Sequence, residues 1–132
     1  MAWLFIDASE PRLFRVGSFT TRSVKVRETA GRSHGVLIEA MRWLKKIGPE
    51  SLDGVCVVSG PGSFTSIRTG VIVGTLIAKL RRVSLISVSC EQATDLERLR
   101  TACLSGAYAP VQYALPEYDT EPNITIARTP TN

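Results

Sequence analysis

The stretch VCVVSGPGSFTSIRTGVIVGTLIAKL, residues 55–80, decides the fold. Residues 55–58 are a continuous apolar run closed by Gly60-Pro61-Gly62, which predicts a strand buried on both faces. Residues 64–80 predict a helix that is apolar almost all round, so both of its sides need cover. A buried strand joined by a glycine turn to a buried helix is typical of an α/β domain with parallel strands.

Upstream of this stretch, three segments predict a meander of strands, because they are apolar or rich in β-branched and aromatic residues. These segments are residues 2–7, 12–19 and 22–28. In the third segment, valines alternate with basic residues at the period of a half-solvated strand. We therefore expect an antiparallel front to the sheet.

Residues 33–47 change to helical spacing, with Ser33 as the predicted N-cap and Gly48-Pro49 ending the helix. One predicted stripe and its neighbours are apolar: Leu37, Ala40, Met41 and Leu44, with Val36, Trp43 and Ile47 beside them. This apolar face is wider than one contact with a sheet requires.

Downstream, residues 83–88 predict a buried strand and residues 92–104 a more charged helix. Four of the seven prolines follow Gly106, too closely spaced for a helix. We expect residues 1–106 to form one domain with a mixed five-stranded sheet flanked by helices, and residues 107–132 to form a proline-rich C-terminal tail or edge segment.

The composition is that of an ordinary globular protein, with 44% hydrophobic and 21% charged residues. The net charge of +4 is spread over pairs such as Lys45-Lys46 and Arg81-Arg82. These pairs suit the negative ends of helix dipoles better than they suit nucleic acid, because a phosphate-binding surface would cluster its basic residues on one face. The opening residues lack the features of a signal peptide, and no apolar run reaches the roughly 20 residues that cross a bilayer. We expect a cytoplasmic protein with no membrane partner.

Candidate metal or catalytic residues are few. The three cysteines are far apart, and His34 is the only histidine. A zinc or two-metal centre needs several converging ligands, so we expect no metal, no cofactor and no catalytic residue. His34 is expected to be a surface or capping residue.

The glycine turn itself has two interpretations. Free backbone N–H groups at the start of a helix can hold an anion, and Ser63 or Thr65 can cap that helix. The candidate anion site comprises Gly60, Gly62, Ser63, Thr65 and Arg68. Plain packing is the alternative, because the lysine and spacing of a P-loop are absent.

The predicted helix also offers a partner surface. Small residues recur every four positions, which would let another helix backbone approach closely. The candidate interface comprises Ser66, Gly70, Gly74 and Ala78 with Ile72, Leu76 and Trp43. Burial on the chain's own sheet is the alternative for one side of the helix. If the row met a partner, Gly74→Leu would abolish association and leave the monomer folded.

Residues 60–70, GPGSFTSIRTG, closely resemble the GPGSFTGxRxG signature of the TsaB (YeaZ) family, with Ser66 in place of a glycine. The surroundings are similar too, including an opening strand that ends in Asp7-Ala8-Ser9. The resemblance covers about residues 3–95. It implies an actin-like, sugar-kinase-like (ASKHA, ribonuclease H-like) fold, of which this chain would hold the first of two domains.

The same resemblance implies a function. A TsaB-like chain would be a non-catalytic scaffold that binds TsaD, the catalytic paralogue, in the threonylcarbamoylation of tRNA adenosine, with TsaE acting indirectly. A second copy would take the place of TsaD when TsaD is absent, and tRNA would be met only within the complex. The resemblance also places Asp7 where kinase-like relatives hold a metal-associated aspartate, although Asp7 is equally suited to a strand-end turn.

Two other functions remain open from the sequence. One is an ATP-binding phosphotransferase-like protein of the same fold, and the other is a protein that binds tRNA directly. Dispersed basic residues and the lack of an aromatic stacking motif argue against the second.

Overall fold

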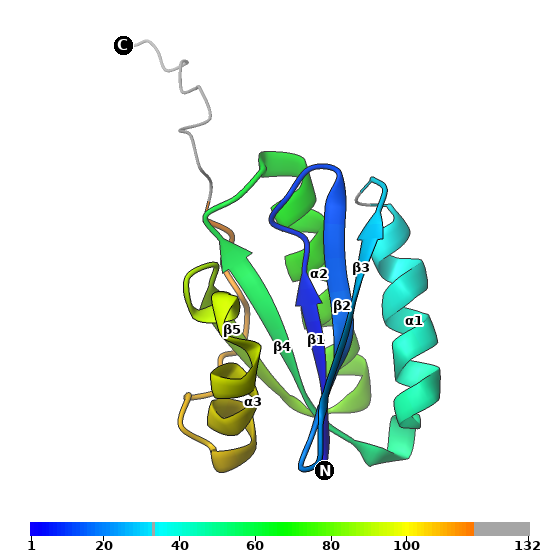
Figure 1. Ribbon diagram of the computed structural model, residues 1–132, viewed down its shortest axis with the longest axis vertical. Helices are drawn as coiled ribbons and strands as arrows, with labels where there is room; N and C mark the ends of the chain where they lie inside the picture. The colour runs from blue at the N-terminus through cyan, green and yellow to red at the C-terminus, as the bar shows by residue number, and fades with distance from the viewer. Residues whose placement is uncertain (33, 118–132) are drawn as a thin grey trace, which may run out of the picture.

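The computed structural model describes residues 1–32 and 34–117. One mixed sheet of five strands, in the order β3-β2-β1-β4-β5, forms the centre of the domain (Figure 1). The strands are β1 (Ala2–Asp7), β2 (Leu13–Thr20), β3 (Val24–Ala30), β4 (Leu52–Gly60) and β5 (Ser84–Ser89). β1, β2 and β3 pair antiparallel, whereas β1, β4 and β5 run parallel. The predicted mixed five-stranded sheet is confirmed.

Helices cover both faces of the sheet. The α-helices are α1 (Gly35–Ile47), α2 (Phe64–Arg81) and α3 (Leu96–Ser105), with short 3-10 turns η1 (Pro49–Ser51) and η2 (Gln92–Thr94). α1 and α2 pack side by side on one face, and α3 lies on the other (Figure 1). None of the helices in residues 1–32 and 34–117 combines the length and apolar character needed to cross a bilayer.

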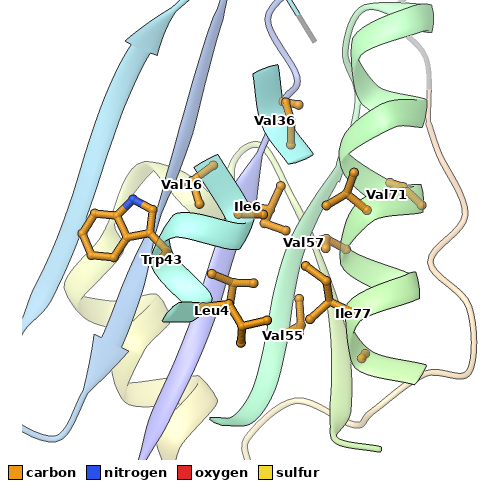
Figure 2. Close-up of a cluster of buried hydrophobic side chains, with 14 of the residues drawn as sticks. Leu4, Ile6, Val16, Val36, Trp43, Val55, Val57, Val71 and Ile77 are labelled. Atoms are coloured by element: carbon orange, nitrogen blue, oxygen red, sulfur yellow. The ribbon is translucent and has the colours of Figure 1, made fainter. Parts of the chain in front are cut away.

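The hydrophobic core has two halves because β1 and β4 are buried on both faces. Figure 2 shows the half beneath α1 and α2, where Leu4, Ile6, Val55 and Val57 meet side chains of both helices. The alternate residues of the same strands, including Phe5 and Cys56, face α3. Two buried faces explain why these strands are continuous apolar runs in the sequence.

The first helix starts one residue later than predicted. α1 begins at Gly35, and His34 occupies the N-cap position without a side-chain capping hydrogen bond. The predicted N-cap, Ser33, lies outside the described residues. At the other end, Gly48 donates its N–H to the carbonyl of Leu44, and the helix stops there as predicted.

The predicted helix over residues 92–104 is also corrected. Residues 92–94 form a 3-10 turn, and the α-helix starts only at Leu96. Asp95 interrupts the pattern because its backbone is extended and its side chain accepts a hydrogen bond from the Arg98 N–H at 3.2 Å. A carboxylate that caps the next turn is more stable there than in mid-helix.

The first part of the predicted C-terminal tail packs on the domain. Val111 donates its N–H to the Leu85 carbonyl at 2.8 Å, and Glu117 donates to the Ser59 carbonyl at 2.7 Å. Ala114 between them is buried in the core half beneath α1 and α2. Residues 107–117 therefore cover the edge beside β5 without forming a regular strand, and residues 118–132 of the prediction lie outside the described residues.

Candidate functional site

The glycine turn lies at the edge of the sheet where the parallel strands β1, β4 and β5 all end, the usual place for ligands in such sheets. Gly60 has a φ of +123°, and a β-carbon there would collide with the backbone carbonyl of Glu117. At Gly62, a β-carbon would lie only 2.7 Å from the Ser9 carbonyl oxygen. Both glycines therefore allow neighbouring backbones to approach, which is a packing role.

Hydrogen bonds within the chain occupy part of the candidate anion site. Ser63 is the N-cap of α2 but makes no side-chain capping bond, and its N–H donates to the Ser9 carbonyl at 3.0 Å. The Gly62 N–H donates to the Glu117 carbonyl at 3.1 Å. Two donors that would face an anion are thus used within the chain, and Thr65 lies inside the helix rather than capping it.

Arg68 does not complete the candidate anion site either. Its guanidinium lies 5.2 Å from the centre of the Phe64 ring, as a cation–π contact on the outer side of α2. The structure therefore brings Gly60, Gly62 and Ser63 together and leaves Arg68 on a different surface.

Beside the turn, Asp7 is held by two partners. Arg15 donates two hydrogen bonds to one carboxylate oxygen, at 3.0 and 2.6 Å, and the Ser9 hydroxyl donates to the other at 2.7 Å. Arg15 also reaches the Ala93 carbonyl at 3.2 Å, so it links β2 to η2. A buried carboxylate that accepts two hydrogen bonds from one guanidinium is a structural ion pair, and it has few lone pairs left for a metal or phosphate-bound cation.

The loop after β5 closes this edge. Cys90 donates its backbone N–H to the Gly60 carbonyl and its thiol to the Pro61 carbonyl, both at 2.9 Å. A cavity of about 460 Å³ remains between this loop, Asp7 and Glu28. Among the described residues, 1–32 and 34–117, no three His, Cys, Asp or Glu side chains gather as a metal site.

The row of small residues on α2 faces the chain's own sheet. A β-carbon on Gly70 would lie 2.9 Å from the Ala8 β-carbon, and one on Gly74 would overlap the Val57 side chain. Ser66 and Ala78 in the same row are buried as well. These four residues let α2 approach β1 and β4, so they are not an open surface for a partner helix, and Gly74→Leu would disturb the fold itself.

Trp43 also belongs to the candidate interface, and it too is buried, with 9% of its surface exposed. Its ring packs on the core side of α1, as Figure 2 shows, with the Lys46 ammonium 4.7 Å from the ring centre. A residue in this position contributes to the core rather than to docking.

The remaining candidates, Ile72 and Leu76, are exposed by 57% and 53%. On the neighbouring helix, Leu37 and Met41 are exposed by 48% and 51%. Each pair is spaced i, i+4, so each forms a row along its own helix. We call these four side chains the helix-face surface. The sequence pattern places Leu37 and Met41 on an apolar stripe. That stripe is wider than one contact with a sheet requires, which indicates a second contact surface on this helix.

A groove extends the helix-face surface on the far side of α2. It has a volume of about 740 Å³ and runs between α2 and the segment that contains Tyr113 and Pro116. Ile72 and Leu76 line one wall, and the Lys79 ammonium lies 4.3 Å from the centre of the Tyr113 ring. The outer side of α2 is therefore both apolar and hollowed.

The sheet order, the helices on both faces and the glycine turn at the parallel edge define an α/β domain of the actin-like class. The chain matches the family described as TsaD, tRNA N6-adenosine threonylcarbamoyltransferase, over residues 27–109, and it belongs to that family. No curated protein matches the sequence.

Solved structures agree on the fold. YeaZ from Pseudomonas aeruginosa is 19% identical with a TM-score of 0.60, and the match covers 67% of this chain and 45% of that one. A protein described as similar to peptidase YeaZ from Pseudomonas aeruginosa is 18% identical with a TM-score of 0.60, covering 67% and 43%. The chain spans less than half the length of either. The predicted actin-like, sugar-kinase-like fold class and the resemblance to the TsaB (YeaZ) family are confirmed.

Proposed function

We propose that this chain is a TsaB-type, non-catalytic scaffold subunit of the tRNA threonylcarbamoylation machinery, and that it binds the catalytic paralogue TsaD. Family membership supports the pathway, and the fold shared with YeaZ supports the TsaB-type role. In this proposal the chain acts in the cytoplasm, TsaE acts through the complex, and tRNA is the substrate of that complex.

The helix-face surface is the observation that carries the proposal. Its four apolar side chains lie on two helices that pack side by side over the sheet, and about half of each side chain is exposed (Figure 1). α1 and α2 contact each other, so exposed apolar rows on both helices can form one apolar patch, and a large exposed apolar patch usually marks an interface. Two helices with i, i+4 apolar rows match a partner that presents two helices of its own.

The site at the parallel edge supports a non-catalytic role. In a phosphotransferase, the carboxylate at the end of β1 would be available to a metal-bound nucleotide, but Asp7 is paired with Arg15 and Ser9. The N–H groups of Gly62 and Ser63 are bonded to carbonyls of the chain. These contacts argue against the alternative of an ATP-binding phosphotransferase-like protein.

A mixture of the chain with TsaD from the same organism, analysed by size-exclusion chromatography with light scattering, tests the proposal. We expect a one-to-one complex, and a homodimer of this chain when TsaD is left out at high concentration. A monomer that elutes apart from TsaD at micromolar concentrations of both would refute the scaffold role.

A further inference from the structure

A third pocket lies at the opposite end of the sheet from the glycine turn. It has a volume of about 490 Å³ and is formed where the β2–β3 hairpin tip meets the last turn of α1. Three basic side chains line it, Arg22 and Lys25 from the hairpin and Lys46 from α1. The hydroxyl residues Ser18, Thr20 and Ser23 line it as well.

The strand register places these groups on one side of the sheet. Ser18 pairs directly with Lys25, and directly opposed residues of an antiparallel pair point to the same face. That face is the one covered by α1, since Val16 of the same strand lies in the core half beneath α1. Lys46 from α1 therefore joins Lys25 and Ser18 from above the sheet.

The hairpin tip is held in a fixed shape. The Thr20 side chain accepts hydrogen bonds from the N–H groups of Arg22 and Ser23, at 3.2 and 3.1 Å. From the other face of the sheet, Arg100 donates to the carbonyls of Thr20 and Thr21, at 3.0 and 3.3 Å. A preorganised tip costs less entropy when a ligand binds.

The residues that line the pocket include three cationic side chains and no carboxylate. In the part of the chain that the structure describes, neither Arg22 nor Lys25 nor Lys46 pairs with a carboxylate. Glu39, on the same side of α1, is bonded to Arg42 at 2.7 Å. The carboxyl end of α1 contributes roughly half a negative charge, against three positive ones.

We propose that this pocket binds backbone phosphates of RNA. Cations and hydroxyl donors are the groups that contact phosphate oxygens. Trp43 lines the pocket but is buried and covered by Lys46, so it offers no ring for a base to stack on. The contact therefore reads the backbone and no sequence. The choice of tRNA as the ligand rests on the proposed function.

The pocket and the helix-face surface lie on different sides of α1. Trp43 and Lys46 line the pocket, whereas Leu37 and Met41 belong to the other side of the helix, toward α2. RNA and a protein partner would thus be bound at the same time.

Binding of fluorescein-labelled tRNA to the full chain tests the inference. Fluorescence anisotropy measures the binding constant at KCl concentrations from about 50 to about 200 mM, a range over which phosphate contacts make affinity fall steeply. The test variant is Arg22→Gln/Lys25→Gln. The control is Arg12→Gln/Arg32→Gln, which removes the same charge from exposed residues at the far end of the same hairpin. Melting curves of both variants verify that each is folded.

We expect the wild-type chain to bind tRNA with an affinity that falls steeply with salt. The test variant should lower the slope of log K against log salt by about 1.5 and weaken binding at least about tenfold, because each lost phosphate contact removes roughly 0.7–0.9 from the slope. The control variant should keep the affinity and the salt slope of the wild-type chain. Absence of wild-type binding, or equal losses in both variants, would overturn the inference. Both double variants should bind TsaD normally, so a failure here is separate from a failure of the scaffold role.

Discussion

Gly74 of α2 lies directly over Val57 of β4, so closely that a β-carbon at position 74 would overlap the valine side chain. α2 approaches the sheet along its whole row of small residues, and Gly70 makes the equivalent close approach to Ala8. This close approach packs α2 against β1 and β4, and it makes Gly74 a residue of the fold rather than of an interface.

Gly74→Ala should lower the free energy of unfolding by about 1–2 kcal/mol, because overpacking costs roughly 1–3 kcal/mol and better helix propensity returns up to about 1 kcal/mol. Urea unfolding measures the change. Combination with Val57→Ala should restore part of the loss, since the second change removes the overlapping methyl groups. Strict additivity of the two changes would contradict the contact.

The ion pair of Asp7 and Arg15 predicts a second stability effect. Arg15→Gln leaves the buried carboxylate without its cation and should cost about 2 kcal/mol, less than a fully buried pair because the arginine is partly exposed. Arg12→Gln, an exposed arginine just before the same strand, should change stability by no more than about 0.5 kcal/mol. Similar losses for both variants in urea titrations would show that Asp7 does not depend on Arg15.

Cys56 makes stability depend on alkaline pH. A hydrogen bond with Cys103, together with burial, raises the pKa of the Cys56 thiol well above its ordinary value. As pH rises past the thiol pKa of the unfolded chain, about 8.5, only the unfolded state loses this proton, so the folded state loses relative stability. The effect is absent below that pH.

Cys103 has the opposite effect in the wild type, because the same hydrogen bond lowers the pKa of its thiol. The effect of Cys56 is therefore isolated in a Cys103→Ala background, where burial still raises the pKa of the Cys56 thiol. Between about pH 7.5 and about pH 9.5, the free energy of unfolding should fall by about 1 kcal/mol more in Cys103→Ala than in Cys56→Ala/Cys103→Ala. Identical pH dependence of these two variants in urea titrations would show that Cys56 does not carry the effect.

Much of the fold could be predicted because the relevant signals are local. The buried run at residues 55–58, the alternating valines of β3 and the Gly48-Pro49 stop each depend on a few neighbouring residues. The error at residues 92–104 arose where two local signals compete, since Asp95 both continues the helical spacing and caps a new helix.

The candidate site was harder to predict because its geometry depends on residues distant in sequence. Gly60 needs to be glycine because of the Glu117 backbone, and Gly74 because of Val57. A repeat of small residues shows that something approaches α2 closely, but it does not show whether that is the chain's own sheet or another helix. Burial of Trp43 likewise follows only once α1 is placed on the sheet.

The most direct test of the scaffold proposal is the affinity for TsaD of the wild-type chain and three variants, measured by isothermal titration calorimetry. Ile72→Glu and Leu76→Glu place a charge on the helix-face surface, whereas Thr101→Glu adds the same charge to the exposed side of α3, on the other face of the sheet. We expect tight one-to-one binding by the wild type and Thr101→Glu, and losses on the order of 100-fold for the two helix-face variants. Unchanged binding by Ile72→Glu and Leu76→Glu, or no binding by the wild type, would contradict the account.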